Sequence, residues 1–361
     1  MMRTGVVGYG ACIPKFRIAV EEIHRVWNNT VLEMLRGIQI EERAVLQPDE
    51  DTITLAVLAA KRALKQTRLS RDVVDSLYLG MGTSPWNSKA SSMTAAEALG
   101  LRSNAFVADV QFSGKSATAA LQMAMGLVGS GMAKYSMVIG SDTINRHVAP
   151  GDLYEYTASA GAMALILGGE NIIAEIEDTA SYGTDFSDFF RLEGERFIRM
   201  GGQDILALLD VGLIEHSVIV TKALLEQLGA ESSDYAYAVF QAPFGFVPFA
   251  VGGAVGFTPQ QIGPGLIAPK IGDCGAASSL LSLGAVLDIA QPGDRILVSA
   301  YGFGAGADAF SLRVTPEIEQ TRGRAPTVRA LLEDKKMVDY STAAKFEYKY
   351  VRPAHAISAY V

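Results

Sequence analysis

The chain has 361 residues, of which 49% are hydrophobic, so it is long enough for one large domain or for two fused halves with separate cores. Its formal net charge is -8, which gives the surface no electrostatic reason to bind nucleic acid or an anionic membrane. A ligand that carries phosphate would need a local basic patch, and the sequence does not locate one.

The apolar segments and the cysteines narrow the class of protein further. No apolar run reaches the roughly 18 residues that a membrane-spanning helix needs, and the N-terminus enters a strand without a cleavable signal pattern. The only two cysteines, Cys12 and Cys274, exclude a disulfide framework. We expect both to be reduced, buried thiols in a cytoplasmic protein.

Short apolar strands alternate with longer helices, which predicts an α/β fold with buried sheets. In the first half we expect strands over 5–10, 73–81, 135–140 and 162–167, and helices over 51–65 and 115–129. In the second half we expect helices over 218–228 and 276–290, and strands over 237–241, 295–300 and 310–314. The first helix has Asp51 at its start, where a carboxylate can cap it.

Two segments share one arrangement. Residues 132–167 and 292–314 each read as strand, glycine-rich turn and strand after a long buried helix. This repetition predicts a duplicated fold with five layers, αβαβα. We divide the chain into an N-terminal half (1–169), an inserted or linking segment over one face (170–216) and a C-terminal half with an extended tail (217–361).

Several motifs, in order and along nearly the whole chain, carry a resemblance to a known family. They are Glu42-Arg43-Ala44-Val45, Pro48-Asp49-Glu50-Asp51, Pro150-Gly151-Asp152-Leu153-Tyr154-Glu155-Tyr156-Thr157-Ala158 and Gly272-Asp273-Cys274-Gly275-Ala276-Ala277-Ser278. With these motifs the chain resembles the short prokaryotic 3-hydroxy-3-methylglutaryl-CoA synthases of the thiolase superfamily. The resemblance implies the duplicated thiolase fold.

The family's chemistry uses a cysteine nucleophile at a helix N-terminus, a histidine that polarises the second acyl substrate, and a glutamate that moves the proton. Carried over by motif, the cysteine position holds Gly114, the histidine position Gln241, and the glutamate position Gly82, the last to within about one residue. Neither glycine nor an amide can replace these groups. The resemblance therefore implies an eroded catalytic site.

Other residues near these positions have side chains that could act as a nucleophile or contact a ligand. Ser113 and Ser116 flank Gly114, and either is an alternative nucleophile or a helix cap. His147 follows a strand end, where it is a ligand contact or a surface histidine. Lys115 could meet a CoA phosphate or an interface carboxylate. The remaining members of this residual pocket are Asp273, Cys274 and Tyr301; Tyr301 opens a glycine-rich turn that we interpret as structural. No spacing of histidines or cysteines indicates a metal site.

The loss of three catalytic positions in an intact fold predicts a structural, non-catalytic subunit of a multisubunit acyltransferase that forms C–C bonds. Within the family the chain looks most like the synthase-like subunit of the bacterial monoacetylphloroglucinol acetyltransferase complex. That resemblance implies a homodimer, a thiolase-like catalytic subunit and a small zinc-ribbon/OB-fold protein as partners. We expect the segment 86–93 and the apolar tail 354–361 to form the contact surfaces, because obligate interfaces are more apolar than the ordinary surface.

Two alternatives stay open. The first is an autonomous acyl-CoA condensing or hydrolysing enzyme that uses Ser113 or Ser116, and the second is a CoA-binding module that presents the thioester to a partner. We expect no resident cofactor, and the sequence leaves open whether CoA still binds.

Overall fold

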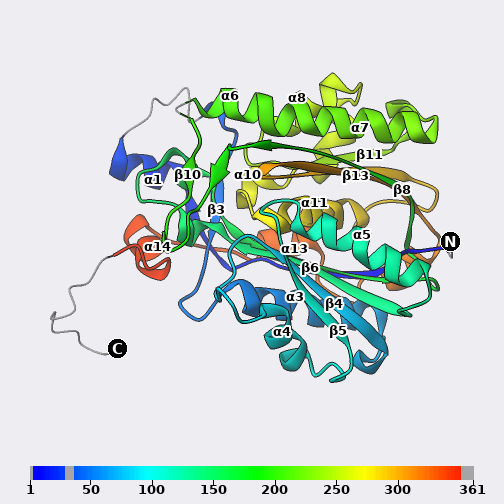
Figure 1. Ribbon diagram of the computed structural model, residues 1–361. Helices are drawn as coiled ribbons and strands as arrows, with labels where there is room; N and C mark the ends of the chain where they lie inside the picture. The colour runs from blue at the N-terminus through cyan, green and yellow to red at the C-terminus, as the bar shows by residue number, and fades with distance from the viewer. Residues whose placement is uncertain (1–2, 29–35, 203, 351–361) are drawn as a thin grey trace.

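The computed structural model describes residues 3–28, 36–202 and 204–350. Its strands form two stacked layers, with helices between them and on both outer faces (Figure 1). The order of hydrogen-bonded strands is β11-β12-β13-β8-β1-β7-β6-β4-β5. The upper layer holds β11 (Tyr237–Phe240), β12 (Arg295–Gly302), β13 (Gly304–Val314) and β8 (Ala174–Phe186). The lower layer holds β1 (Gly5–Cys12), β7 (Ala160–Gly168), β6 (Tyr135–Thr143), β4 (Val74–Met81) and β5 (Phe106–Gln111).

The helices fill the remaining three layers. The outer faces carry α7 (Glu215–Leu228) and α8 (Val247–Ala254) on one side, and α3 (Thr52–Thr67) and α4 (Ser91–Leu99) on the other. Between the sheets lie α5 (Ser116–Gly129) and α11 (Ser278–Leu287). The predicted αβαβα architecture is confirmed.

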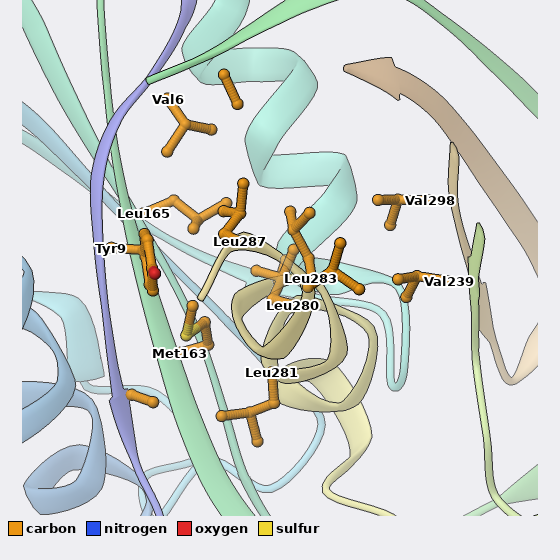
Figure 2. Packing of buried hydrophobic residues seen from close by; sticks show 14 of the residues in the cluster. Val6, Tyr9, Met163, Leu165, Val239, Leu280, Leu281, Leu283, Leu287 and Val298 are labelled. Atoms are coloured by element: carbon orange, nitrogen blue, oxygen red, sulfur yellow. The ribbon is translucent and has the colours of Figure 1, made fainter. Parts of the chain in front are cut away.

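The middle layer explains why α11 is apolar all round. All ten of its residues are buried, because sheet covers it above and below. Leu280, Leu283 and Leu287 lie between Leu165 of β7 on one side and Val298 of β12 on the other (Figure 2). Small residues at the helix ends let backbones approach closely, which is the role expected of the glycine-rich segments.

Smaller elements surround the two sheets. A three-stranded sheet joins β2 (Phe16–Ala19), β3 (Glu42–Val45) and β14 (Lys336–Met337), and a two-stranded sheet joins β9 (Phe189–Phe190) and β10 (Arg199–Met200). The short helices include α1 (Val20–Trp27), α6 (Ile205–Leu209), α9 (Pro259–Ile262), α10 (Ala268–Ile271), α12 (Glu317–Thr321), α13 (Val328–Glu333) and α14 (Tyr340–Phe346).

The segment 170–216 differs from the expectation of an insertion over one face. Residues Ala174–Phe186 form β8, which pairs with β13 along its length and with β1 at Gly5 and Val6. This strand connects the two sheet layers. The second half of β8 is largely exposed and therefore polar, which is why the sequence suggested an insertion instead of a strand. Of the rest of the segment, Phe189, Phe190, Arg191 and Ile198 line the cavity described below. The division into halves at 169 and 217 stays a prediction.

The helix expected over 51–65 is confirmed as α3. Asp51 caps it: its carboxylate accepts a hydrogen bond from the backbone N–H of Thr54, and the Thr54 hydroxyl oxygen accepts one from the backbone N–H of Asp51. Within the described residues, no helix is long and apolar enough to cross a membrane. The predicted contact surface at 354–361 lies outside the described residues.

Candidate active site

A cavity of about 130 Å³ lies where three parallel strands end. In α/β proteins, ligands bind at the carboxyl ends of such strands. Gly82 and Thr83 follow β4, Gln111 ends β5, and Ile144 follows β6. The lining is completed by Ser113, just before α5, and by Phe189, Phe190, Arg191, Ile198 and Phe303.

Ser113 and Gly114 form the turn that leads into α5. Gly114 has φ +89°, a conformation that side chains rarely adopt, and a Cβ at this position would overlap the carbonyl oxygen of Tyr301. The carbonyl of Ser113 accepts a hydrogen bond from the N–H of Phe303 at 2.9 Å. The turn is therefore held against the β12–β13 connection. Of its two residues, Ser113 lines the cavity and Gly114 does not.

Gly82 and Ser113 are neighbours across the cavity wall. A Cβ added to Gly82 would lie 2.7 Å from the Ser113 hydroxyl oxygen. The missing side chain at position 82 thus leaves the space that the serine hydroxyl occupies. The sequence placed these two positions in one site by motif, and the structure brings them together.

Asp142 supports the wall from behind. Its carboxylate accepts hydrogen bonds from the N–H groups of Gly82 and Thr83, both at 2.8 Å, and from the Thr83 hydroxyl at 2.5 Å. The N–H of Ala276 donates to its other oxygen at 2.8 Å. Complete burial raises the pKa of Asp142 to about 6, although all four hydrogen bonds act to lower it. No pattern in the sequence indicates this role, because the donors come from two segments that lie far apart in the chain, 82–83 and 276.

Lys115 has an intrachain partner. Its ammonium lies 2.8 Å from the buried carboxylate of Asp308 and 4.9 Å from the centre of the Phe112 ring. Asp308 also accepts hydrogen bonds from Thr118 and Ser181 at 2.7 Å. This pairing fixes the start of α5 to β13, so neither of the two external partners considered for Lys115 is needed to explain it.

The other candidate nucleophiles are enclosed. Ser116 is fully buried and does not line the cavity. Burial raises the pKa of Cys12 to about 12 and raises that of Cys274 further, so both thiols stay protonated at neutral pH. These properties leave Ser113 as the serine that a ligand in the cavity can meet.

Three further predicted residues support the structure instead of lining the cavity. Gln241 is 4% exposed and donates to the carbonyl of Gly275 at 3.2 Å. Asp273 accepts from the Tyr154 hydroxyl at 2.7 Å. The Tyr301 hydroxyl donates to Asp188 at 2.5 Å, and burial raises the pKa of that carboxyl.

His147 lies directly behind the cavity lining. Its carbonyl accepts from the N–H of Ile198, a lining residue, at 2.8 Å. Its Nδ1 lies 3.1 Å from the carbonyl oxygen of Arg196, so Nδ1 carries the proton of the neutral ring. Burial, and then the charges of Arg191, Arg196 and Arg146, lower the pKa of His147 to about 4. The imidazole is therefore uncharged at neutral pH.

Sequence reasoning missed Thr83, Gln111, Ile144 and the whole wall from 189 to 198. The strand-end rule could have found the first three, because each ends or follows a parallel strand. No local pattern marks the segment from 189 to 198, since it reaches the cavity only through tertiary packing. Within the described residues, a larger cavity of about 350 Å³ near Phe244 and Phe246 has only apolar side chains in its lining, so it offers no group for chemistry.

The chain is similar to curated proteins over nearly its whole length. It is 42% identical to "Hydroxymethylglutaryl-CoA synthase" of Methanopyrus kandleri over 347 residues, covering 96% of this chain and 98% of that protein. It is 42% identical to the protein of the same name from Methanosarcina barkeri over 353 residues, covering 97% and 100%. No family model matches the chain.

Solved structures share the fold. One described as "MvaS in complex with 3-hydroxy-3-methylglutaryl coenzyme A" superposes with a TM-score of 0.87 at 21% identity, covering 100% of this chain and 94% of the other. The structure of 3-oxoacyl-[acyl-carrier-protein] synthase III from Aquifex aeolicus superposes with a TM-score of 0.79 at 22% identity, covering 86% and 99%. At these identities the likeness establishes the thiolase-like fold alone.

The comparisons overturn one expectation. The sequence predicted a structural, non-catalytic subunit of a multisubunit acyltransferase, but the full-length relatives are named as synthases. Nothing among them points to a phloroglucinol acetyltransferase. The prediction was wrong because it weighed three catalytic positions above the similarity of the whole chain. The relatives favour the alternative, an autonomous condensing enzyme.

Proposed function

Because this chain belongs to the hydroxymethylglutaryl-CoA synthase family, we propose that it is an acyl-CoA condensing enzyme that works by itself, with Ser113 as its nucleophile. The observation that carries the proposal is the position of Ser113. This serine lines the cavity at the strand ends, beside Gly114, which stands at the family's cysteine position.

In the proposed first step, the Ser113 hydroxyl oxygen attacks the carbonyl carbon of an acyl-CoA thioester. A C–O bond forms, the C–S bond breaks, and the hydroxyl proton ends on the thiol of CoA. Developing negative charge lies near the N-terminus of α5, a 14-residue helix whose dipole favours it. The enclosed thiols and the buried Ser116 are not alternatives for this step.

CoA enters this proposal as the carrier of the acyl group and not as a resident cofactor. We also propose a homodimer. In the described sheet β5 is an edge strand, with one side unpaired and with Phe106 57% exposed. The thiolase-like subunit and the zinc-ribbon/OB-fold protein stay untested predictions.

Intact-mass measurement after incubation with acetyl-CoA tests the nucleophile. We expect a covalent acetyl adduct that peptide mapping places on Ser113. The adduct should disappear in Ser113→Ala and persist in Ser116→Ala, the matched control on the same turn. The absence of an adduct in the wild-type chain, or its persistence in Ser113→Ala, would overturn the proposal.

A further inference from the structure

The glycine-rich turn between β12 and β13 holds the side chain of Lys115. Gly302 and Gly306 lie opposite each other at this turn. A Cβ at Gly302 would lie 2.5 Å from Cγ of Lys115, and one at Gly306 would lie 3.1 Å from its Cδ. The aliphatic chain of Lys115 therefore packs against backbone at both positions, in space that two side chains would otherwise fill.

The ammonium group of Lys115 is paired with a buried carboxylate. The lysine is 9% exposed, and its Nζ lies 2.8 Å from Oδ1 of Asp308, which is fully buried. Burying a cation is costly unless the cation is paired, so this contact keeps the lysine at one place in the fold. The hydroxyl of Thr118, in the first turn of α5, lies 2.7 Å from the other oxygen of the same carboxylate. Asp308 therefore joins β13 to the start of α5 at two points.

Lys115 and Ser113 flank Gly114, and both are anchored to the same part of the upper sheet. The carbonyl of Ser113 accepts a hydrogen bond from the N–H of Phe303, and the side chain of Lys115 reaches Asp308. Gly114 lies between these anchors with φ +89°, and a glycine has many other conformations open to it. The two anchors therefore keep the turn in one conformation. Without the lysine anchor, rotation about Gly114 would carry the Ser113 hydroxyl away from the cavity.

We infer that Lys115 is a positioning residue for acyl transfer to Ser113. Its ion pair with Asp308 holds the turn at Gly114 in the conformation in which Ser113 lines the cavity. The lysine itself does not line the cavity, so it acts on the nucleophile and not on the acyl-CoA. This inference rests on the proposed function, because it takes Ser113 as the nucleophile. It adds the pair of residues that keeps this nucleophile in place.

The rate of acetylation of Ser113 tests the inference, followed by intact mass on the full chain at increasing concentrations of acetyl-CoA. Lys115→Met removes the charge and keeps a side chain of similar length. We expect its maximal rate to fall by about 10- to 100-fold, because a misplacement of about 1 Å can cost about 100-fold in rate. The acetyl-CoA concentration that gives half the maximal rate should change by less than about two-fold, since ligand binding is not affected.

Two further variants control the experiment, and circular dichroism checks that each is folded. Lys115→Met/Asp308→Asn removes both charges, so it leaves no unpaired charge buried and should fold even where the single variant does not. Because the effect belongs to the pair, the double variant should be slowed to about the same extent as Lys115→Met. Lys134→Met removes an exposed lysine that is paired with Glu170 and lies outside the cavity lining. It should acetylate at the wild-type rate.

A wild-type maximal rate in Lys115→Met or in the double variant would overturn the inference. A rise in the half-saturating concentration at an unchanged maximal rate would overturn it as well, because Lys115 would then contact the CoA. The proposed function fails by a different readout, the absence of an acetyl adduct on Ser113 of the wild-type chain. The two failures are therefore distinguishable.

Discussion

The carbonyl oxygen of Tyr301 occupies the space into which a side chain at position 114 would project. Gly114 also has a positive φ of +89°. Both features follow from the contact between the turn before α5 and the β12–β13 connection, where Phe303 donates to Ser113. The family's cysteine position is therefore occupied by the residue that this backbone geometry favours.

Gly114→Ala should destabilise the fold by about 2 to 4 kcal/mol, because it adds backbone strain and a steric overlap with main chain that cannot move aside. Urea unfolding followed by circular dichroism measures the change. Gly126→Ala, on the helix that follows this turn, is the matched control: its Cβ would meet nothing within 4 Å. That control should be neutral or stabilising by about 0.5 to 1 kcal/mol. Equal stability of both variants would contradict the strain at position 114.

How much of this site the sequence could predict depends on how local the signal is. The motif around Ser113 and the cap at Asp51 are short patterns, so α3, α5 and the turn between β5 and α5 could be placed. The partner of Lys115 could not, because Asp308 lies on β13 and reaches α5 only after the sheets stack. The position of Arg191 in the cavity wall could not be predicted for the same reason. Its segment has no periodicity, and its neighbours in the cavity come from β4, β5 and β6.

The raised pKa of Asp142 predicts that pH has opposite effects on activity and on stability. Its folded pKa of about 6 lies above the ordinary 3.8, so its contribution to stability is fully present below the ordinary value and is lost as pH rises through about 6. Acylation of Ser113 should move the other way. Protonation below pH about 6 replaces a carboxylate that accepts four hydrogen bonds with a neutral acid, which loosens the Gly82–Thr83 wall.

The measurement is the pH dependence of both quantities in wild type and Asp142→Asn. The variant should acylate slowly at every pH, and it should lose a pH-dependent stability term of up to about 3 kcal/mol, since one pKa unit corresponds to about 1.4 kcal/mol. Asp109→Asn is the matched control. Asp109 also accepts two backbone hydrogen bonds, from Ser91 and Ser92, but it is exposed. An unchanged inflection near pH 6 in Asp142→Asn would show that another group titrates.

A buried cluster of charges ties the last described helix to the cavity wall. Glu347 is fully buried, with Arg43 at 2.5 Å and Lys349 at 3.2 Å. Asn145, which follows the lining residue Ile144, donates to the same carboxylate at 3.0 Å. Burial alone would raise the pKa of Glu347, but Arg43 and Lys349 outweigh it, so the pKa is lowered.

Glu347→Gln keeps the size of the side chain but leaves Glu155 as the one buried carboxylate near two buried cations, 2.5 Å from Lys349 and 4.0 Å from Arg43. The loss of the close partner of Arg43 should cost about 3 to 5 kcal/mol at neutral pH. Because the folded pKa is depressed, the wild-type contribution is present above the ordinary glutamate value and is lost as pH falls through the folded pKa. The difference between wild type and variant should therefore narrow on acidification. Urea unfolding at about pH 7 and about pH 4 measures it. Glu319→Gln, an exposed carboxyl on α12, should change little at either pH. A constant difference at both pH values would mean that Glu347 acts through packing and not through its charge.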